Sequence, residues 1–167
     1  MPEPAGSRRQ ARERALSLLY EAESKDVTPA AVLASLPVAP DPFAVEVVRG
    51  VGVHMDALDT WITRYARDWT IERMPALDRA LLRMGVFELL HRPDVPTGAV
   101  ISEAVELAQR FSTEESSRFV NGMLARIAEK VRAGSGGKTM DAEAVGADPA
   151  EDDQPPGGAV VEDRLHQ

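Results

Sequence analysis

Hydrophobic residues recur along the chain at the three- and four-residue spacing of amphipathic helices, whereas stretches of strict alternation are absent. In the first such segment, residues 7–23, the apolar stripe consists of Ala11, Ala15, Leu18, Leu19 and Ala22. This spacing places all of these side chains on one face of a helix, as expected for a face that packs against a core. The pattern therefore predicts an all-α protein that begins with a helix at about Ser7.

Proline and capping residues divide the remaining hydrophobic pattern into separate helices. Thr28-Pro29 and Asp41-Pro42 each combine a side chain that can cap a helix with a proline suited to its first turn. The second pair predicts a long helix that reaches Tyr65, with a bend at Gly50–Gly52. A short turn at residues 71–74 precedes three further predicted helices, which begin at Pro75, at Thr97 and at Ser112 or Thr113. We predict a compact bundle of six to seven helices over residues 7–133.

The composition is that of a single globular domain without the motifs of an enzyme. The chain has 167 residues, of which 44% are hydrophobic, and it contains no cysteine. It lacks both an apolar run long enough to span a membrane and an apolar N-terminal signal segment, so we expect a cytoplasmic protein. The histidines are dispersed and no glycine-rich loop is followed by lysine, so neither a metal site nor a nucleotide cofactor is predicted.

The formal net charge of −8 is concentrated at the C-terminal end of the sequence. Residues 134–167 contain eight acidic and two basic residues, and their glycines and prolines accompany few large apolar side chains. Such a segment cannot bury enough surface to offset its loss of conformational entropy. We therefore expect a disordered acidic tail after residue 133 and a flexible N-terminus over residues 1–6. The body between them is nearly neutral, so a basic surface on it can still attract nucleic acid.

Four arginines lie in the first predicted helix: Arg8, Arg9, Arg12 and Arg14. On a helical wheel, Arg8, Arg9 and Arg12 cluster on one flank of the apolar stripe, and Arg14 falls on the opposite flank. A helix N-terminus and arginine side chains both favour phosphate groups, which makes an RNA-binding patch one interpretation. A solvated basic helix end is the other interpretation, and the composition does not decide between the two.

The last predicted helix carries two unusual residues. Gly122 lies inside an otherwise strong helical pattern, where glycine costs roughly 1 kcal/mol relative to alanine. Such a glycine commonly marks the close approach of another backbone or of a ligand. Phe119 falls at the edge of the buried stripe, where an aromatic ring can stack on an unpaired base or pack beneath a neighbouring helix. On the preceding helix, Glu103 and Glu106 look like a solvated face.

Four blocks of the sequence are informative through their order and spacing. They are RRQARERALSLLY at residues 8–20, LDRALLR at 77–83 followed by FEL at 87–89, VP at 95–96 followed by ISEAVELA at 101–108, and RFVNGML at 118–124. Each block alone is weak evidence, and their combination over about residues 8–131 is specific. Together they resemble the NusB family of transcription antitermination factors. The resemblance implies an all-helical fold without catalytic activity.

The resemblance also implies particular partners. Members of this family bind the single-stranded boxA element of nascent RNA, chiefly from ribosomal RNA operons. They act together with NusE, a small-subunit ribosomal protein, in an antitermination complex on RNA polymerase. The positions that match RNA-contacting residues of the family are Arg8, Arg9, Arg12, Glu115, Arg118 and Phe119. The positions that match the NusE-binding surface are Asp78 and, less directly, Tyr20 and Glu72.

Two other functions are consistent with parts of the sequence. A purely protein-binding helical module would use the surface around Asp78 and would have no RNA affinity of its own. A NusB-like domain of an RNA cytosine methyltransferase would need a large cofactor-binding domain and cysteines, which this sequence does not contain. The sequence also leaves open a homodimer in which self-association hides the arginines, and it leaves open whether RNA binding needs NusE.

Overall fold

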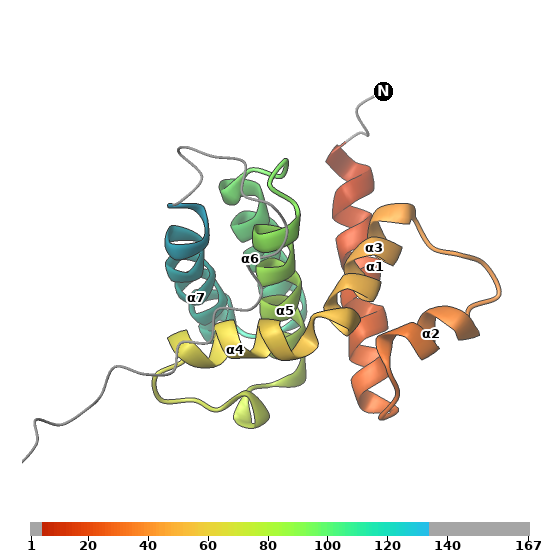
Figure 1. Ribbon diagram of the computed structural model, residues 1–167, viewed down its shortest axis with the longest axis horizontal. Coiled ribbons are helices and arrows are strands. Elements are labelled where there is room, and N and C mark those ends of the chain that lie inside the picture. Colours follow the sequence, from red (N-terminus) through yellow and green to blue (C-terminus); the bar gives the residue numbers. More distant parts are fainter. Residues whose placement is uncertain (1–4, 134–167) are drawn as a thin grey trace, which may run out of the picture.

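The computed structural model describes residues 5–133, with side chains from Ser7 onward, and this part of the chain forms seven α-helices, one 3-10 turn and no strand. The α-helices are α1 (Ala5–Ser24), α2 (Pro29–Ser35), α3 (Pro42–Val53), α4 (Met55–Tyr65), α5 (Ala76–His91), α6 (Thr97–Phe111) and α7 (Glu114–Arg132), and the 3-10 turn η1 is Ile71–Arg73. In Figure 1, α5 lies between the α1–α3 side of the bundle and α7. The predicted all-α bundle is confirmed.

Residues 1–4 and 134–167 lie outside the described residues, and with them most of the predicted flexible N-terminus and the whole predicted acidic tail. The first helix begins at Ala5, slightly before the predicted start at Ser7. Within residues 5–133, no helix is both long enough and apolar enough to cross a membrane.

Side-chain caps fix the starts of three helices at residues that the sequence predicts. Thr28, Asp41 and Thr113 each accept a hydrogen bond from a backbone amide in the first turn, at 3.1, 2.8 and 3.0 Å. The third bond decides between Ser112 and Thr113 as the cap of α7. These bonds satisfy amide groups that the start of a helix leaves unpaired, which is why the capping pattern predicted the boundaries well.

The prediction of one long helix from Pro42 to Tyr65 is wrong, because the chain breaks at His54 into α3 and α4. His54 leaves the regular helical conformation, with φ −102° and ψ 17°. Helix α3 packs against α1, α2 and α5, whereas α4 packs against α5 and α7. The two segments follow different directions over the core (Figure 1), and a straight helix could not make both sets of contacts.

Helix α5 is the centre of the bundle, because it contacts α1, α3, α4, α6 and α7. It is buried on most sides, yet two of its buried residues are acidic: Asp78 in its first turn and Glu88 in its last. Gly85 permits a close approach of α7, because a Cβ atom there would lie 2.8 Å from the methyl carbons of Leu124. A buried carboxylate must be paired or hydrogen-bonded to be tolerated. The partners of these two acids therefore distinguish the two ends of α5.

Two helical glycines have opposite surroundings. A Cβ atom on Gly50 would lie 2.1 Å from Cε2 of the Phe87 ring, so the absence of a side chain lets α3 approach α5 closely. Around the Cβ position of Gly122, no atom from another described part of the chain lies within 4 Å. The interpretation of Gly122 as a point of close approach between parts of this chain is therefore wrong.

These surroundings predict opposite effects of the same substitution. Gly50→Ala forces the Phe87 ring to move and should lower the free energy of unfolding by about 1–3 kcal/mol, as overpacking usually does. Gly122→Ala removes the helical cost of glycine at an open position and should raise the free energy of unfolding by about 1 kcal/mol. Urea denaturation measures both changes. Destabilisation of similar size in the two variants would contradict the packing described here.

Candidate nucleic-acid interface

Arg12 does not lie on the exposed flank of α1 that the helical wheel predicts. Its side chain is only 7% exposed, and its guanidinium donates from Nε and Nη2 to the Glu88 carboxylate at 2.7–3.2 Å. Because Glu88 is itself 3% exposed, the two residues form a buried ion pair between α1 and α5. The wheel considers one helix alone and cannot show that α5 covers this flank. Contact between Arg12 and RNA would require the pair to break.

Arg9 is half-exposed, and two glutamates of α6 neutralise it. Its guanidinium donates to the Glu103 carboxylate at 3.2 and 3.0 Å, and its Nη2 also lies 3.0 Å from Glu106 Oε2. The hydrogen bond with Glu103, followed by the charges of both glutamates, raises the pKa of Arg9. Glu103 and Glu106 are therefore partners of α1, and their interpretation as a solvated face is wrong.

Arg8 belongs to a group of charged side chains around the Phe43 ring at the start of α3. The guanidinium carbons of Arg8, Arg12 and Arg92 lie 5.0, 5.1 and 5.2 Å from the centroid of that ring. Arg92 also donates to the Asp94 carboxylate at 3.0 Å, and this bond, with the charges of Arg92 and Arg8, lowers the pKa of Asp94 to about 2. Each arginine of the predicted patch thus already contacts another part of the fold.

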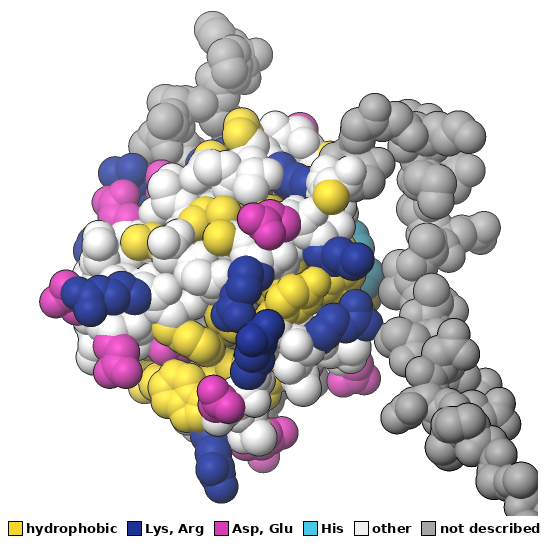
Figure 2. Space-filling view, turned by 90° about the vertical axis from the view of Figure 1, so that its left-hand side faces the viewer, with side chains coloured by type: hydrophobic (Ala, Val, Ile, Leu, Met, Phe, Trp, Pro, Cys, Tyr) yellow, Lys and Arg dark blue, Asp and Glu magenta, His cyan; other side chains and the backbone are white. Residues whose placement is uncertain are grey.

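A hollow of about 780 Å³ opens where the end of α4 and the loop after it meet the starts of α5 and α7. We call it the α7 hollow, and its lining includes Tyr65, Arg67, Trp69, Asp78, Glu115 and Phe119. Its volume falls in the range of about 300–1,000 Å³ that is usual for small-molecule sites. Figure 2 views the side of the molecule where α7 and the end of α4 lie, and hydrophobic surface and basic side chains adjoin there.

Two aromatic rings meet in the α7 hollow. Trp69 and Phe119 lie edge to face, with ring centroids 5.3 Å apart and an interplanar angle of 85°. Phe119 is half-buried and packs against the core, while Trp69 is 40% exposed. The predicted position of Phe119 at the edge of the core is confirmed. Trp69 carries no sequence signal for a site, because it follows α4 in an irregular loop and meets Phe119 only through the fold.

Asp78 lies at the floor of the α7 hollow and is fully buried. Its Oδ1 accepts a hydrogen bond from the Ser112 hydroxyl at 3.1 Å. Its Oδ2 is buried and has no hydrogen-bond partner among the described residues. A buried carboxylate oxygen without a donor is costly, so this position favours a donor from a bound molecule. The hollow also brings Asp78 together with Glu115 and Phe119, which the sequence assigned to a different surface.

The α1 arginines and the α7 hollow lie at opposite ends of α5. Arg12 pairs with Glu88 in the last turn of α5, whereas Asp78 in the first turn lines the hollow. Ten residues of helix correspond to about 15 Å along its axis. In Figure 1 the start of α1 and the loop that precedes α5 are likewise on opposite sides of the molecule. The fold therefore does not bring the α1 arginines together with Phe119.

The remaining predicted site residues lie at the surface. Arg118 is 76% exposed and pairs with the equally exposed Glu114 at 2.7 Å, an ion pair of small energetic weight. Glu115 is exposed beside the α7 hollow. Tyr20 is exposed on α1, and Glu72 is exposed in η1. These side chains are accessible to a partner without any rearrangement of the core.

The fold also brings together two histidines that are far apart in the sequence. The rings of His54 and His91 stack with centroids 4.3 Å apart, and Phe87 lies 5.1 Å from His91 on the same crossing of α3 and α5. Burial, and then the neighbouring His54, lower the pKa of His91. Within the described part of the chain, no group of three or more potential ligands could hold a metal ion. We interpret the stack as packing between α3 and α5.

Comparison with known proteins identifies relatives over most of the described chain. A family model described as the NusB family matches residues 9–129. The "Transcription antitermination protein NusB" of Kineococcus radiotolerans is 49% identical over 127 residues, which cover 74% of this chain and 93% of the relative. The protein with the same description from Salinispora arenicola is 48% identical over 130 residues, covering 74% of this chain and 96% of the relative.

Solved structures agree with these sequence relatives. T. maritima NusB superposes with a TM-score of 0.68 at 33% identity, covering 78% of this chain and 94% of that one. A complex described as antitermination factors NusB and NusE with dsRNA contains a chain that superposes with a TM-score of 0.65 at 25% identity. That match covers 76% of this chain and 99% of the other. The similarity therefore extends over nearly the full length of each solved chain.

The buried Arg12–Glu88 pair predicts a structural role for Arg12. Arg12→Met leaves Glu88 buried without a partner and should lower the free energy of unfolding by about 3–5 kcal/mol. The double variant Arg12→Met/Glu88→Leu removes both charges and should recover most of that loss. Urea denaturation compares them, with Arg118→Ala as a control in an exposed pair, for which a loss below about 1 kcal/mol is expected.

RNA titration of the double variant separates stability from binding. If Arg12 acts through the fold, the double variant binds RNA as the wild type does. Loss of RNA binding in a double variant with restored stability would show instead that Arg12 contacts RNA directly, as the family resemblance implies.

Proposed function

Since this chain belongs to the NusB family, whose members are transcription antitermination proteins and not enzymes, we propose that it binds the boxA element of nascent ribosomal RNA. In this proposal it acts together with NusE in an antitermination complex on RNA polymerase. The solved structure described as NusB and NusE in complex with dsRNA supports the general arrangement of such a chain with NusE and an RNA. The functional unit is the helical domain over residues 7–133.

The observation that carries the proposal is the aromatic pair in the α7 hollow. Trp69 and Phe119 lie edge to face and both line a space of about 780 Å³. Unpaired bases stack on such side chains, and each base contributes about 1–3 kcal/mol by alanine substitution. A base within a duplex is not free to enter a hollow of this kind. The site therefore favours single-stranded RNA, as the boxA assignment requires.

The exposed residues around the hollow supply polar contacts in this proposal. Glu115 can accept a hydrogen bond from a base amino group, in the way that carboxylates recognise cytosine. Arg118 can exchange its weak pair with Glu114 for a phosphate group. Arg8 and Arg9, on α1, lie near the other end of α5 from the hollow and would contact the RNA at a separate point along the strand. Arg12 holds α1 in place for both of them.

Removal of either aromatic ring is expected to weaken RNA binding. Phe119→Ala and Trp69→Ala should each raise the Kd for single-stranded boxA RNA about 5- to 100-fold, because one stacked base is lost. Phe111→Ala is the matched control, since Phe111 is 44% exposed and does not line the hollow. Fluorescence anisotropy gives the three Kd values, and circular dichroism confirms that each variant is folded.

The same titration distinguishes the site from general electrostatic attraction. A double-stranded version of the RNA should bind the wild type more weakly than the single strand and should respond little to loss of the rings. Equal affinities of the Phe119→Ala, Trp69→Ala and Phe111→Ala variants for single-stranded RNA would refute a base-stacking role for the hollow.

The buried oxygen of Asp78 supports a second contact, with NusE. Its Oδ2 has no donor within the described residues, although it lies at the floor of an open hollow. We assign this oxygen to a donor side chain of NusE, with Tyr20 and Glu72 as exposed members of the same binding surface. NusE and the RNA would then meet at the start of α7.

Asp78→Asn is expected to weaken NusE binding while preserving the fold. The substitution keeps the size of the side chain but removes its charge, and losing one partner of a buried charged hydrogen bond costs about 2–5 kcal/mol. Isothermal titration calorimetry should therefore show a Kd at least tenfold higher, with Asp56→Asn as a control at an exposed acid in the first turn of α4, outside the proposed surface. An unchanged Kd for Asp78→Asn would remove Asp78 from the NusE interface.

A purely protein-binding module is the second candidate function, and the unpaired Asp78 oxygen is the observation that favours it. The two candidate functions differ in whether this chain binds RNA in the absence of NusE. A gel shift with boxA RNA in the absence of NusE shows a complex if the chain has its own RNA affinity. A shift that appears only when NusE is added supports the protein-binding module.

A further inference from the structure

The cations of this protein divide into two groups according to their partners. Seven arginines of the described chain lie within 4.0 Å of a carboxylate: Arg9, Arg12, Arg79, Arg83, Arg92, Arg110 and Arg118. In contrast, four cations without such a pair among the described residues line a single pocket between the end of α4 and the second half of α7: Arg64, Arg67, Arg126 and Lys130. We call it the α4–α7 pocket.

The α4–α7 pocket has a volume of about 370 Å³, and neighbouring groups contact three of its side chains. Arg126 donates from Nε to the Gly122 carbonyl at 3.2 Å. Arg64 lies 5.3 Å from the centroid of the Trp61 ring, and Tyr65 stacks on the same ring at 6.3 Å. These contacts orient Arg126 and Arg64 without placing a carboxylate against them, which favours an anion in the pocket.

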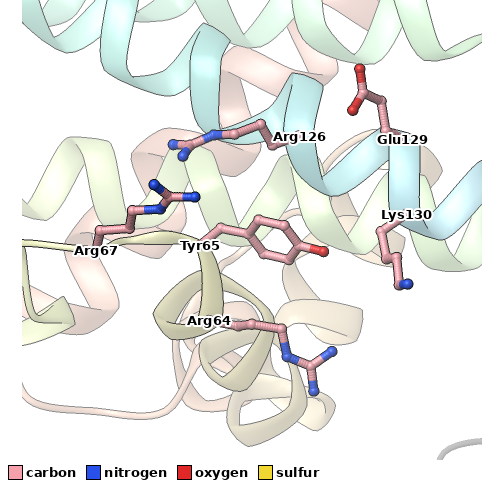
Figure 3. Close-up of a pocket in the computed structure, with 6 residues that line it drawn as sticks. All are labelled: Arg64, Tyr65, Arg67, Arg126, Glu129 and Lys130. Atoms are coloured by element: carbon pink, nitrogen blue, oxygen red, sulfur yellow. The ribbon is translucent and has the colours of Figure 1, made fainter.

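Figure 3 shows how these side chains surround Tyr65. The guanidinium groups of Arg67 and Arg126 lie toward one another on one side of the ring, and Arg64 and Lys130 lie on the side of the phenolic hydroxyl. Among the described residues, Glu129 is the one carboxylate in the lining, and its side chain is turned away from the ring in this view. Four cations that line one pocket repel one another, and an anion between them removes that cost.

We propose that the α4–α7 pocket binds phosphate groups of the RNA strand whose bases occupy the α7 hollow. The inference rests on the RNA-binding function proposed above. The pocket is continuous with the hollow, because both are lined by Tyr65, Arg67 and Arg126. Arginine guanidinium groups bind phosphate with paired hydrogen bonds, and a single strand alternates phosphates with the bases that aromatic rings stack. A strand leaving the hollow along α7 would place its backbone in this pocket.

The α4–α7 pocket also replaces the α1 arginines as the main source of attraction for RNA. The charges of Arg9 and Arg12 are neutralised by the acids of α6 and α5. The cations of the pocket are exposed and have no ion pair among the described residues. Their position next to the aromatic pair explains how a chain of net charge −8 can attract a polyanion.

Two double variants that have the same net charge as each other test this proposal. Arg67→Gln/Lys130→Gln removes two charges from the pocket, and Arg14→Gln/Arg49→Gln removes two exposed charges that have no ion pair among the described residues and do not line either site. Fluorescence anisotropy with single-stranded boxA RNA over a range of KCl concentrations gives the Kd and its salt dependence for both variants and the wild type. Circular dichroism verifies that the variants are folded.

In the pocket variant, the slope of log K for RNA binding against log salt should be less steep than in the wild type by about 1.4. Each phosphate contact on a single strand contributes about 0.7 to this slope, and the variant removes two cations. Its affinity at low salt should fall on the order of tenfold, while the control variant keeps the wild-type slope. If both variants lose RNA affinity equally, the attraction depends on the total charge of the protein and not on the pocket, and the proposal is overturned. Wild-type affinity in the pocket variant would overturn it as well, while leaving the RNA-binding function itself intact.

A competition experiment separates RNA from free phosphate as the source of the anion. Inorganic pyrophosphate should displace RNA from the wild type and have a weaker effect on the Arg67→Gln/Lys130→Gln variant. If pyrophosphate binds the pocket without displacing RNA, the pocket takes small phosphate anions instead and the RNA assignment is wrong. Failure of the wild type to bind any RNA would overturn both this proposal and the function on which it rests.

Discussion

The buried ion pair between Arg12 and Glu88 is the constraint on which the arrangement of this protein depends. Helix α5 contacts five other helices, so a carboxylate in its last turn has no access to water and must find a cation within the fold. Arg12 provides that cation from α1, and the pair fixes α1 against α5. The pair also affects the candidate RNA-binding site, because it buries Arg12, which the sequence places on the surface.

The two ends of α5 differ because their acids are satisfied differently. At the C-terminal end, Glu88 is fully paired, and the arginines around it contact glutamates or the Phe43 ring. At the N-terminal end, Asp78 accepts one hydrogen bond from Ser112, and its other oxygen has no donor among residues 5–133. The aromatic pair lies beside this second end, and the cations without an ion pair among the described residues continue from it along α4 and α7. We propose that partners bind at this end of α5, where the acid is incompletely satisfied within the described part of the chain.

Most of the fold could be predicted from the sequence, because caps and hydrophobic spacing are local properties. Thr28, Asp41 and Thr113 fix helix starts through bonds to amides within three residues of themselves. The break at His54 escaped prediction, because it depends on which helices α3 and α4 meet in the bundle. Phe119 could be placed at the edge of the core for the same local reason that its helix could be predicted.

The site was harder to predict than the fold, because its electrostatics depend on contacts between distant residues. A helical wheel assigns Arg12 to an exposed flank, but its partner Glu88 lies 76 residues away. Arg9 likewise meets Glu103, 94 residues away. Trp69, which meets Phe119 across the hollow, comes from a loop without any periodic signal. The family resemblance could carry over individual positions, and only the fold could show which of them retain an uncompensated charge.

We expect RNA to bind at the end of α4 and along α7, with a lesser part played by the start of α1. Amide chemical shifts of the ¹⁵N-labelled protein, recorded during titration with single-stranded boxA RNA, distinguish these two surfaces. The largest shift changes are expected at Tyr65, Arg67, Trp69 and Phe119, with small changes at Arg9 and Arg12. Large changes confined to the first turns of α1, with α4 and α7 unaffected, would contradict this expectation.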